Sequence, residues 1–175
     1  MLSLMLRSFA LLTMTTFLLS GCGYHAVGSA SRLPANVRTI AVPVFTTRVQ
    51  QFHTEVTFTQ AVIRELNSRT SYRVLNQDAD ADATLRGTIL SEVASPLTYD
   101  SSSGQTSSYI ITIDAKVVLT ARDGHVLYRN DSLLFREQYQ STQDVSGFIR
   151  EDRPAVQRLA RDFAQTVVAN ITESF

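Results

Sequence analysis

The chain has 175 residues and a balanced charge, with 16 lysines and arginines against 16 aspartates and glutamates. This length suits a single domain, and the neutral charge excludes bulk binding of nucleic acid, which depends on a basic excess. Cys22 is the only cysteine, so the chain can form no internal disulfide. Fifteen of the 16 basic residues are arginine. We interpret this as a compositional bias of the host, although guanidinium groups also suit phosphate and carboxylate ligands.

The first 21 residues have the features of a secretory leader. Arg7 is their only charge, and residues 9–19 form the apolar run FALLTMTTFLL, which is shorter than the roughly 20 residues of a membrane-spanning helix. The run leads into Leu19-Ser20-Gly21-Cys22, which resembles the lipobox of bacterial lipoproteins, L-[AST]-[GA]-C. An ordinary buried helix is the alternative, but it does not explain why the apolar run is followed directly by a lipobox-like sequence. We therefore expect a signal peptide over residues 1–21 that is removed before Cys22.

The resemblance to the lipobox implies that Cys22 carries a membrane anchor. In bacterial lipoproteins, a diacylglycerol is attached to this cysteine sulfur and a further acyl chain to the new amino terminus. Two or more chains hold a protein stably at a membrane, whereas one chain holds it only marginally. Gly23 stands where aspartate commonly favours retention in the inner membrane. We therefore expect attachment to the periplasmic side of the outer membrane, and no cofactor beyond the covalent lipid.

The mature chain begins with a tether, which we place over residues 22–37 because they are small and polar. A folded domain over residues 38–175 follows. Its first segment, residues 39–45 (TIAVPVF), is β-branched and predicts a strand. Because proline donates no ladder hydrogen bond, we expect this strand to lie at an edge or to end near Pro43.

A helix and a short strand come next. Apolar residues at helical spacing predict a helix over residues 52–69, and Thr54 is a suitable N-cap. Residues 72–75 then predict a strand. Asp78, Asp80 and Asp82 follow with the opening spacing of an EF-hand loop, but the glycine and the final glutamate of that motif are missing. We expect a solvated loop here and no calcium site.

Residues 84–93 alternate and predict a strand with Val93 on its apolar face and Glu92 on its polar face. Residues 95–108 are rich in turn formers and predict a loop. Longer alternating stretches predict two more strands, over residues 109–121 and 126–139. The chain between these two strands is Arg122-Asp123-Gly124, which predicts a tight turn.

The turn suggests a register for the last two strands. With Gly124 in the left-handed conformation, Ala121 lies opposite His125. This register matches apolar residues on one face: Leu119 with Leu127, Ile113 with Leu133, and Ile111 with Phe135. A slip by one residue would exchange the two faces. Two pairs do not fit the register, namely Val117 opposite Arg129 and Ala115 opposite Asp131.

The C-terminal segment predicts the clearest helix. Pro154 suits its first turn, and Asp152 can cap it. Its apolar residues form one stripe about five turns long: Val156, Leu159, Ala160, Phe163, Ala164, Val167, Val168 and Ile171. A helix on a membrane surface is the alternative interpretation. The polar face mixes both signs of charge with amides, so we expect the helix to pack on the sheet.

The predicted order β-α-β-β-β-β-α belongs to the α+β class. We expect the two helices to pack on one face of a four- to five-stranded, mostly antiparallel (mixed) sheet, because each helix has a single apolar stripe. The other face of the sheet should stay polar and open. Catalytic motifs are absent, and His25, His53 and His125 have no partners at metal-ligand spacing. We expect no enzyme, no catalytic residue and no metal site.

With these residues laid out, the chain resembles the LptE family of lipopolysaccharide-assembly lipoproteins. An ordered set of segments carries the likeness: Gly21-Cys22-Gly23-Tyr24, residues 40–45, the helix over residues 55–69 leading into Tyr72-Arg73-Val74, and residues 81–89. The last of these, ADATLRGTI, is similar to the family pattern ADA-x-L-x-G-x-I.

The resemblance implies a small outer-membrane lipoprotein that plugs the lumen of the large β-barrel LptD and assists its assembly. With that barrel, it would deliver lipopolysaccharide (LPS) to the outer leaflet. Family members are also reported to bind LPS through basic residues on the sheet side. A free-standing envelope lipoprotein that scaffolds other periplasmic proteins is the alternative function. Its docking surface would be the loop over residues 95–108 or the second helix.

The basic residues on or near the predicted strands are Lys116, Arg136, Arg86 and Arg129. Lys116 lies on the polar face of its strand, as does Arg136 in the register given above. Phosphates of lipid A suit such groups, so we name these four residues as candidate LPS contacts. The alternative is that they are solubilising or strand-pairing charges.

Overall fold

The computed structural model describes residues 33–49, 54–102, 104, 106–140 and 152–172. The expected signal peptide, the lipobox, Cys22, His25 and His53 lie outside these ranges. The described elements are, in chain order, β1 (Thr39–Ala41), β2 (Thr46–Thr47), α2 (Thr54–Arg69), β3 (Arg73–Leu75), β4 (Ala83–Tyr99), β5 (Thr106–Ala121), β6 (Val126–Gln140) and α3 (Asp152–Thr172). This confirms the predicted order, with the two-residue strand β2 added.

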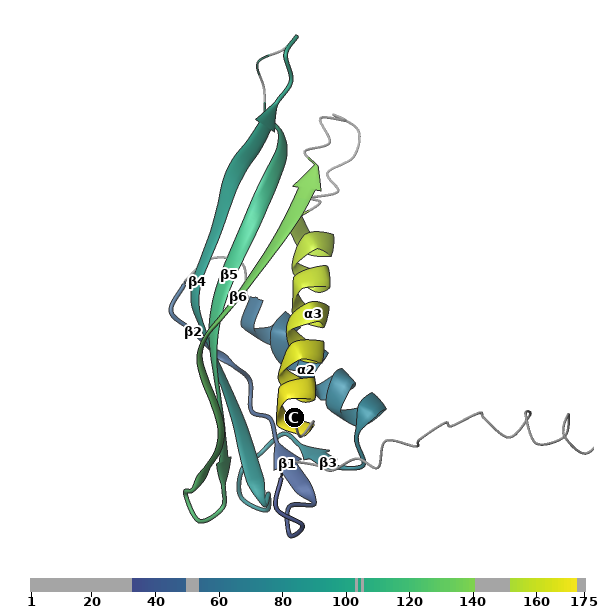
Figure 1. Cartoon of the computed structure of the whole chain (residues 1–175), viewed down its shortest axis with the longest axis vertical. Coiled ribbons are helices and arrows are strands. Elements are labelled where there is room, and N and C mark those ends of the chain that lie inside the picture. Colours follow the sequence, from purple (N-terminus) through teal and green to yellow (C-terminus); the bar gives the residue numbers. More distant parts are fainter. Residues whose placement is uncertain (1–32, 50–53, 103, 105, 141–151, 173–175) are drawn as a thin grey trace, which may run out of the picture.

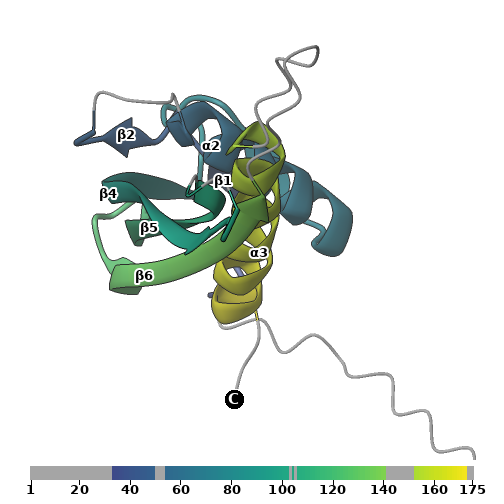
Figure 2. The ribbon, with the colours of Figure 1, turned by 90° about the horizontal axis from the view of Figure 1, so that it is seen from above.

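The described strands form one mixed sheet in the order β3-β1-β4-β5-β6, with β2 paired to β4. Strand β1 runs parallel to both of its neighbours, whereas β4, β5 and β6 are antiparallel. The sheet thus has one strand more than the four to five expected, and that strand is β2. Strand β1 ends at Ala41, before Pro43 as predicted, but it lies inside the sheet. Helices α2 and α3 cover the same side of the sheet (Figures 1 and 2).

The core lies between the helices and the inner face of the sheet, and Phe163 of α3 is at its centre. The Phe163 ring is fully buried and contacts Phe45, Phe58 and Phe135, with centroid distances of 6.1, 5.0 and 5.7 Å. These rings come from the β1–β2 connection, α2 and β6, so one side chain joins both helices to the sheet. Burying an aromatic side chain of this size stabilises the fold by roughly 1.5–3 kcal/mol.

The packed body begins earlier in the chain than residue 38. Leu33 and Val37, which the sequence analysis places in the tether, are buried as part of the core. Both are apolar residues within a polar segment, and their burial fixes the chain directly before β1. The segment that can act as a tether is therefore shorter than residues 22–37.

The prediction of a loop over residues 95–108 is wrong. Strands β4 and β5 continue through most of this segment and form a long hairpin. Figure 1 shows this hairpin rising beyond the helices. Its serines and threonines bond across the strands, as between Thr98 Oγ1 and Ser108 Oγ at 2.5 Å. Pro96 is tolerated because no described strand pairs with the other edge of β4 there. The turn itself contains Asp100 and Gly104, whose φ is +67°.

A β-bulge at Leu90 changes which face the second half of β4 presents. Ile89 pairs with Ala115 but Ser91 pairs with Asp114, so Leu90 is an extra residue on its strand. Glu92 therefore turns to the helix side, where the Thr54 hydroxyl at the start of α2 donates a 3.0 Å hydrogen bond to Glu92 Oε2. Regular alternation along the strand predicted Glu92 on the polar face and Val93 on the apolar face. In the structure the two are exchanged, and Val93 is exposed.

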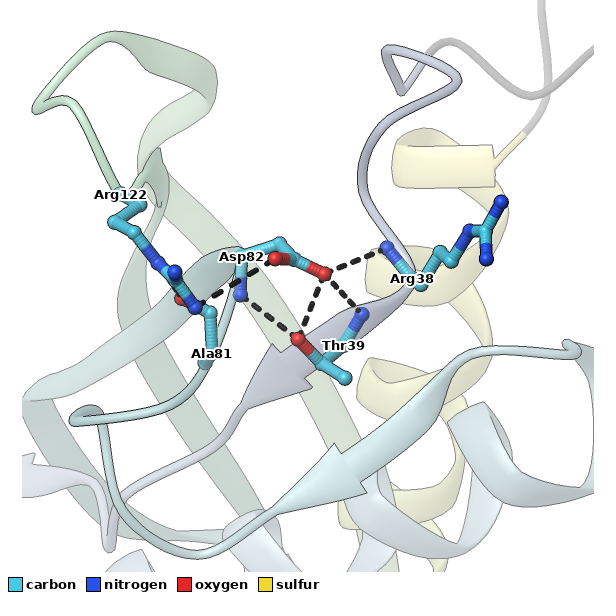
Figure 3. A network of polar contacts seen from close by, with 5 residues as sticks. All are labelled: Arg38, Thr39, Ala81, Asp82 and Arg122. Atoms are coloured by element: carbon cyan, nitrogen blue, oxygen red, sulfur yellow. Dashed lines mark hydrogen bonds and ion pairs between the residues drawn. The ribbon is translucent and has the colours of Figure 1, made fainter.

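The side chain of Asp82, directly before β4, links the start of β4 to the start of β1 through hydrogen bonds (Figure 3). Its Oδ2 accepts hydrogen bonds from the backbone N–H groups of Arg38 and Thr39, both at 3.0 Å, and from the Thr39 hydroxyl at 2.8 Å. Its Oδ1 lies 3.6 Å from a guanidinium nitrogen of Arg122, at the end of β5. These donors, the Arg38 N–H first, lower the pKa of Asp82. Asp82 is therefore structural, whereas Asp78 and Asp80 are exposed, as expected for the acidic loop.

Gly87 in the middle of β4 makes room for the ring of Phe45. A Cβ at this position would lie 2.4 Å from Phe45 Cδ2 and Cε2, which real structures do not allow. The Phe45 ring is itself buried against Phe163, so it has little space into which to move. Gly87 is thus required by packing and not by backbone conformation.

We predict that Gly87→Ala lowers the free energy of unfolding by about 1–3 kcal/mol, because the added methyl overpacks the core. Denaturant unfolding of the purified protein measures this loss. Phe45→Leu provides the control, since a smaller side chain should relieve the clash and make the cost of Gly87→Ala smaller in that background. An equal cost in both backgrounds would show that the Phe45 ring is not the cause.

Candidate functional site

The candidate site is the face of β4, β5 and β6 that points away from the helices, which we call the open face. Odd-numbered residues of β5 from Ile111 to Leu119 are buried, and the even-numbered residues between them are only half-buried. The even-numbered residues therefore form the middle of the open face. Strand pairing then places the neighbours of each of these residues on β4 and β6.

The register between β5 and β6 agrees with the prediction at the turn and departs from it further along. Gly124 has a φ of +89°, and the Ala121 N–H donates to the His125 carbonyl at 2.8 Å. Two irregularities then add one residue each to β6, so that Leu119 pairs with Tyr128, Ile113 with Phe135 and Ile111 with Glu137. The predicted pairs Leu119–Leu127, Ile113–Leu133 and Ile111–Phe135 are therefore wrong.

Beyond the second irregularity the total shift is two residues, so the predicted faces survive there, whereas residues 128–130, between the two irregularities, exchange faces. Leu133 and Phe135 remain on the helix side, opposite Ala115 and Ile113. Glu137 also lies on this side, opposite Ile111, where Arg158 of α3 forms an ion pair with it. The bulges also remove the two mismatches in the predicted register, since Val117 pairs with Asn130 and Ala115 with Leu133.

Lys116 and Arg129 share one carboxylate on the open face. Lys116 Nζ lies 2.9 Å from Asp131 Oδ1, and Arg129 Nε lies 2.8 Å from Asp131 Oδ2. The hydrogen bond from Arg129, followed by that from Lys116, lowers the pKa of Asp131 to about 2. The same bond raises the pKa of Arg129. Two cations thus share the Asp131 carboxylate, and the carboxylate of Asp114 lies on the same face of β5.

The other two candidate cations lie on the same face. Arg86 of β4 and Arg129 of β6 are the two cross-strand neighbours of Val118, and Arg86 forms an ion pair with Asp78. Arg136 lies opposite Thr112, further toward the hairpin, and has no ion pair within the described residues. The structure thus brings Arg86, Lys116 and Arg129 together and places Arg136 apart from them.

The open face also carries apolar side chains that the sequence analysis did not assign to it. Val93 lies opposite Thr112, Leu134 lies opposite Asp114, and each of these apolar residues is 53% exposed. The bulge in β4 brings Val93 to this face, whereas Leu134, next to the inward-facing Leu133, lies on the open face in both the predicted and the observed register. Mixed cationic and apolar groups can contact an anionic amphiphile, because the cations give charge-assisted hydrogen bonds and the apolar groups bury hydrocarbon.

Asp131 is the principal residue of the site that sequence reasoning missed. The signal was present, because the predicted register placed Asp131 opposite Ala115 and Arg129 opposite Val117. A charged residue opposite a core residue on the buried face indicates a bulge that returns the charge to solvent. Ser132 at the same bulge donates a 2.9 Å hydrogen bond to Asp114 Oδ1, another open-face contact found only in the structure.

The described part of the chain shows no cluster of three or more histidine, cysteine, aspartate or glutamate side chains that could hold a metal ion. His125, the one histidine within the described ranges, is exposed in the β5–β6 turn. Among the helices described, none is long and apolar enough to span a membrane.

Comparison with solved structures identifies the fold as that of small bacterial lipoproteins. An uncharacterised lipoprotein B from Nitrosomonas europaea is similar at 14% identity and a TM-score of 0.57, over 86% of this chain and 90% of that one. The rare lipoprotein B from Shewanella oneidensis has 13% identity and a TM-score of 0.51, over 75% and 92%. A putative lipoprotein from Caulobacter crescentus has 10% identity and a TM-score of 0.52, over 74% and 87%.

The family follows from the sequence itself. Residues 37–171 match the family described as "LptE: Lipopolysaccharide-assembly", and the chain belongs to that family. This confirms the resemblance drawn from the ordered segments of the mature chain. No curated protein matches the chain.

We predict that carboxyl NMR titration will give Asp131 a pKa of about 2 in the folded protein, below its ordinary value of 3.8. A depressed folded pKa means that the ion cluster stabilises the fold above about pH 4 and that this contribution is lost as the pH falls through about 2. The double variant Lys116→Gln, Arg129→Gln should return the pKa of Asp131 toward its ordinary value. A wild-type pKa near 4 would contradict the shared ion pair.

Proposed function

We propose that this protein is an outer-membrane lipoprotein subunit of the lipopolysaccharide translocon. It would plug the lumen of an LptD-type β-barrel, assist assembly of that barrel and help to deliver LPS to the outer leaflet. The observation that carries the proposal is the match of residues 37–171 to the lipopolysaccharide-assembly family. In this function the protein acts by holding its partners and not by catalysis.

The open face fits the interior of a β-barrel. The lumen of an outer-membrane barrel is polar and contains water, so charged groups that enter it keep their hydration. Lys116, Arg129 and Asp131 would be costly to bury in an apolar interface, because desolvation of charges is expensive. A sheet covered by helices on one side and charged on the other therefore suits a plug inside a wet barrel.

The same face supports contact with LPS. Lys116 and Arg129 share the carboxylate of Asp131, so neither cation has a carboxylate to itself, and Arg136, opposite Thr112, has no ion pair within the described residues. We propose that these residues, together with Arg86, bind phosphate groups of lipid A through charge-assisted hydrogen bonds. Val93 and Leu134, both exposed nearby, would contact acyl chains.

The anchor completes the proposal. We infer that Cys22 carries a diacylglycerol and an N-linked acyl chain, and that Leu19, Ser20 and Gly21 direct this modification. Leu33, the first described residue of the packed body, comes eleven positions after Cys22. An extended chain of this length spans at most about 35–40 Å. The body would therefore work close to the membrane surface, where a barrel lumen opens to the periplasm.

We predict that affinity purification of the lipidated protein from detergent-solubilised outer membranes recovers a large β-barrel protein in a one-to-one complex. Mass spectrometry and native gel electrophoresis of the eluate measure this. An eluate without a large β-barrel protein would refute the plug function and favour a free-standing lipoprotein.

A separate prediction concerns the anchor. Cys22→Ala should leave an unprocessed precursor that does not label with palmitate, because the thiol that receives the diacylglycerol is gone. Ser20→Ala is the matched control, since alanine is accepted at this position of the lipobox and processing should stay normal. Palmitate labelling of the Cys22→Ala protein, read by gel autoradiography, would show that the lipid is attached elsewhere.

A further inference from the structure

A groove runs between α2 and α3 on the side of the molecule away from the open face. It has a volume of about 380 Å³, and both helices contribute to its walls. Ala61 of α2 and Ala164 of α3 line it, and both are buried where the helices meet. Their small side chains leave space that longer side chains on either side enclose. The groove is therefore a consequence of close helix packing and is separate from the surface assigned to LPS.

The groove is positively charged. Arg64 of α2 and Arg161 of α3 line it from opposite helices, and both are exposed. Neither arginine has an ion pair within the described residues. The one carboxylate in the lining is Glu65, which Arg69 neutralises through an ion pair of 3.0 Å one turn along α2. Two guanidinium groups in this groove thus have charge that no described carboxylate balances.

Glutamine amides line the same groove as these guanidinium groups. Gln60 of α2 and Gln157 and Gln165 of α3 line the same groove, and each side chain offers both hydrogen-bond donors and an acceptor. A polypeptide presents N–H donors and carbonyl acceptors along its backbone, and its aspartates and glutamates pair with guanidinium forks. A phosphate presents only acceptors, which would leave the amide oxygens unused. The chemistry therefore favours an acidic polypeptide segment over a lipid headgroup.

We propose that the α2–α3 groove docks an acidic segment of the partner protein, with Arg64 and Arg161 binding its carboxylates. This inference rests on the proposed function, in which that partner is the β-barrel around the plug. The helices and the open face lie on opposite sides of the molecule (Figure 2), so the groove can hold the barrel wall while the open face stays accessible to lipid. The groove sets which way the plug faces.

Charge reversal in the groove tests the proposal. The double variant Arg64→Glu, Arg161→Glu, made in the full lipidated chain, should reduce recovery of the barrel about tenfold or more, because carboxylates would then face carboxylates. Arg48→Glu, Arg73→Glu is the matched control, since both arginines are exposed outside the groove and the change in charge is the same. Thermal unfolding should show that both variants fold. Equal recovery of the barrel by the groove variant and wild type, or equal loss in the control, would overturn the proposal.

Site-specific photocrosslinking separates failure of this proposal from failure of the proposed function. A benzophenone amino acid at Gln157 should crosslink to an acidic peptide segment that mass spectrometry identifies. Changing the carboxylates of that segment to arginine should restore binding to the Arg64→Glu, Arg161→Glu variant. Crosslinks to lipid alone, or none, would overturn the groove assignment. An acidic segment from a protein other than a barrel, with restored binding, would uphold the groove and overturn the plug function.

Discussion

The structure depends on burial of one face of the sheet and not of the other. Phe163 joins α2, α3, β6 and the β1–β2 connection in a single aromatic cluster on the inner face. Both described helices pack on the inner face of the sheet. The opposite face must therefore be stable in contact with water or with a polar partner. The shared carboxylate of Asp131 meets this requirement, because it holds two neighbouring cations in place without removing them from solvent.

The β-bulges decide which residues belong to each face. In β4, the extra residue Leu90 turns Glu92 toward the start of α2 and Val93 outward. In β6, two extra residues keep Leu133 and Phe135 on the helix side and bring Asp131 beside Lys116. A strand without these bulges would bury charge or expose core residues. The cationic cluster is therefore a product of the fold and not of sequence spacing alone.

These bulges also explain how far the sequence could predict the structure. The apolar stripe of α3, the left-handed turn at Gly124 and the alternation of β5 are local patterns, and each was confirmed. The extent of the β4–β5 hairpin was not predictable from composition, because its serines and threonines bond across strands in place of forming a loop. Pairings beyond the first bulge cannot be predicted from alternation, because each bulge shifts the register by one residue. Asp82 looked like part of an acidic loop, and only the fold brings Arg38 and Thr39 to its carboxylate.

The chain belongs to the lipopolysaccharide-assembly family. The central proposal is that this protein is needed to place LPS at the cell surface. Depletion of the protein in its native cell tests this claim most directly, with LPS at the surface and the folding state of the barrel measured together. We predict that surface LPS falls while the barrel misassembles, and that the intact protein supplied in trans restores both. Unchanged surface LPS and a correctly assembled barrel after complete depletion would contradict the claim.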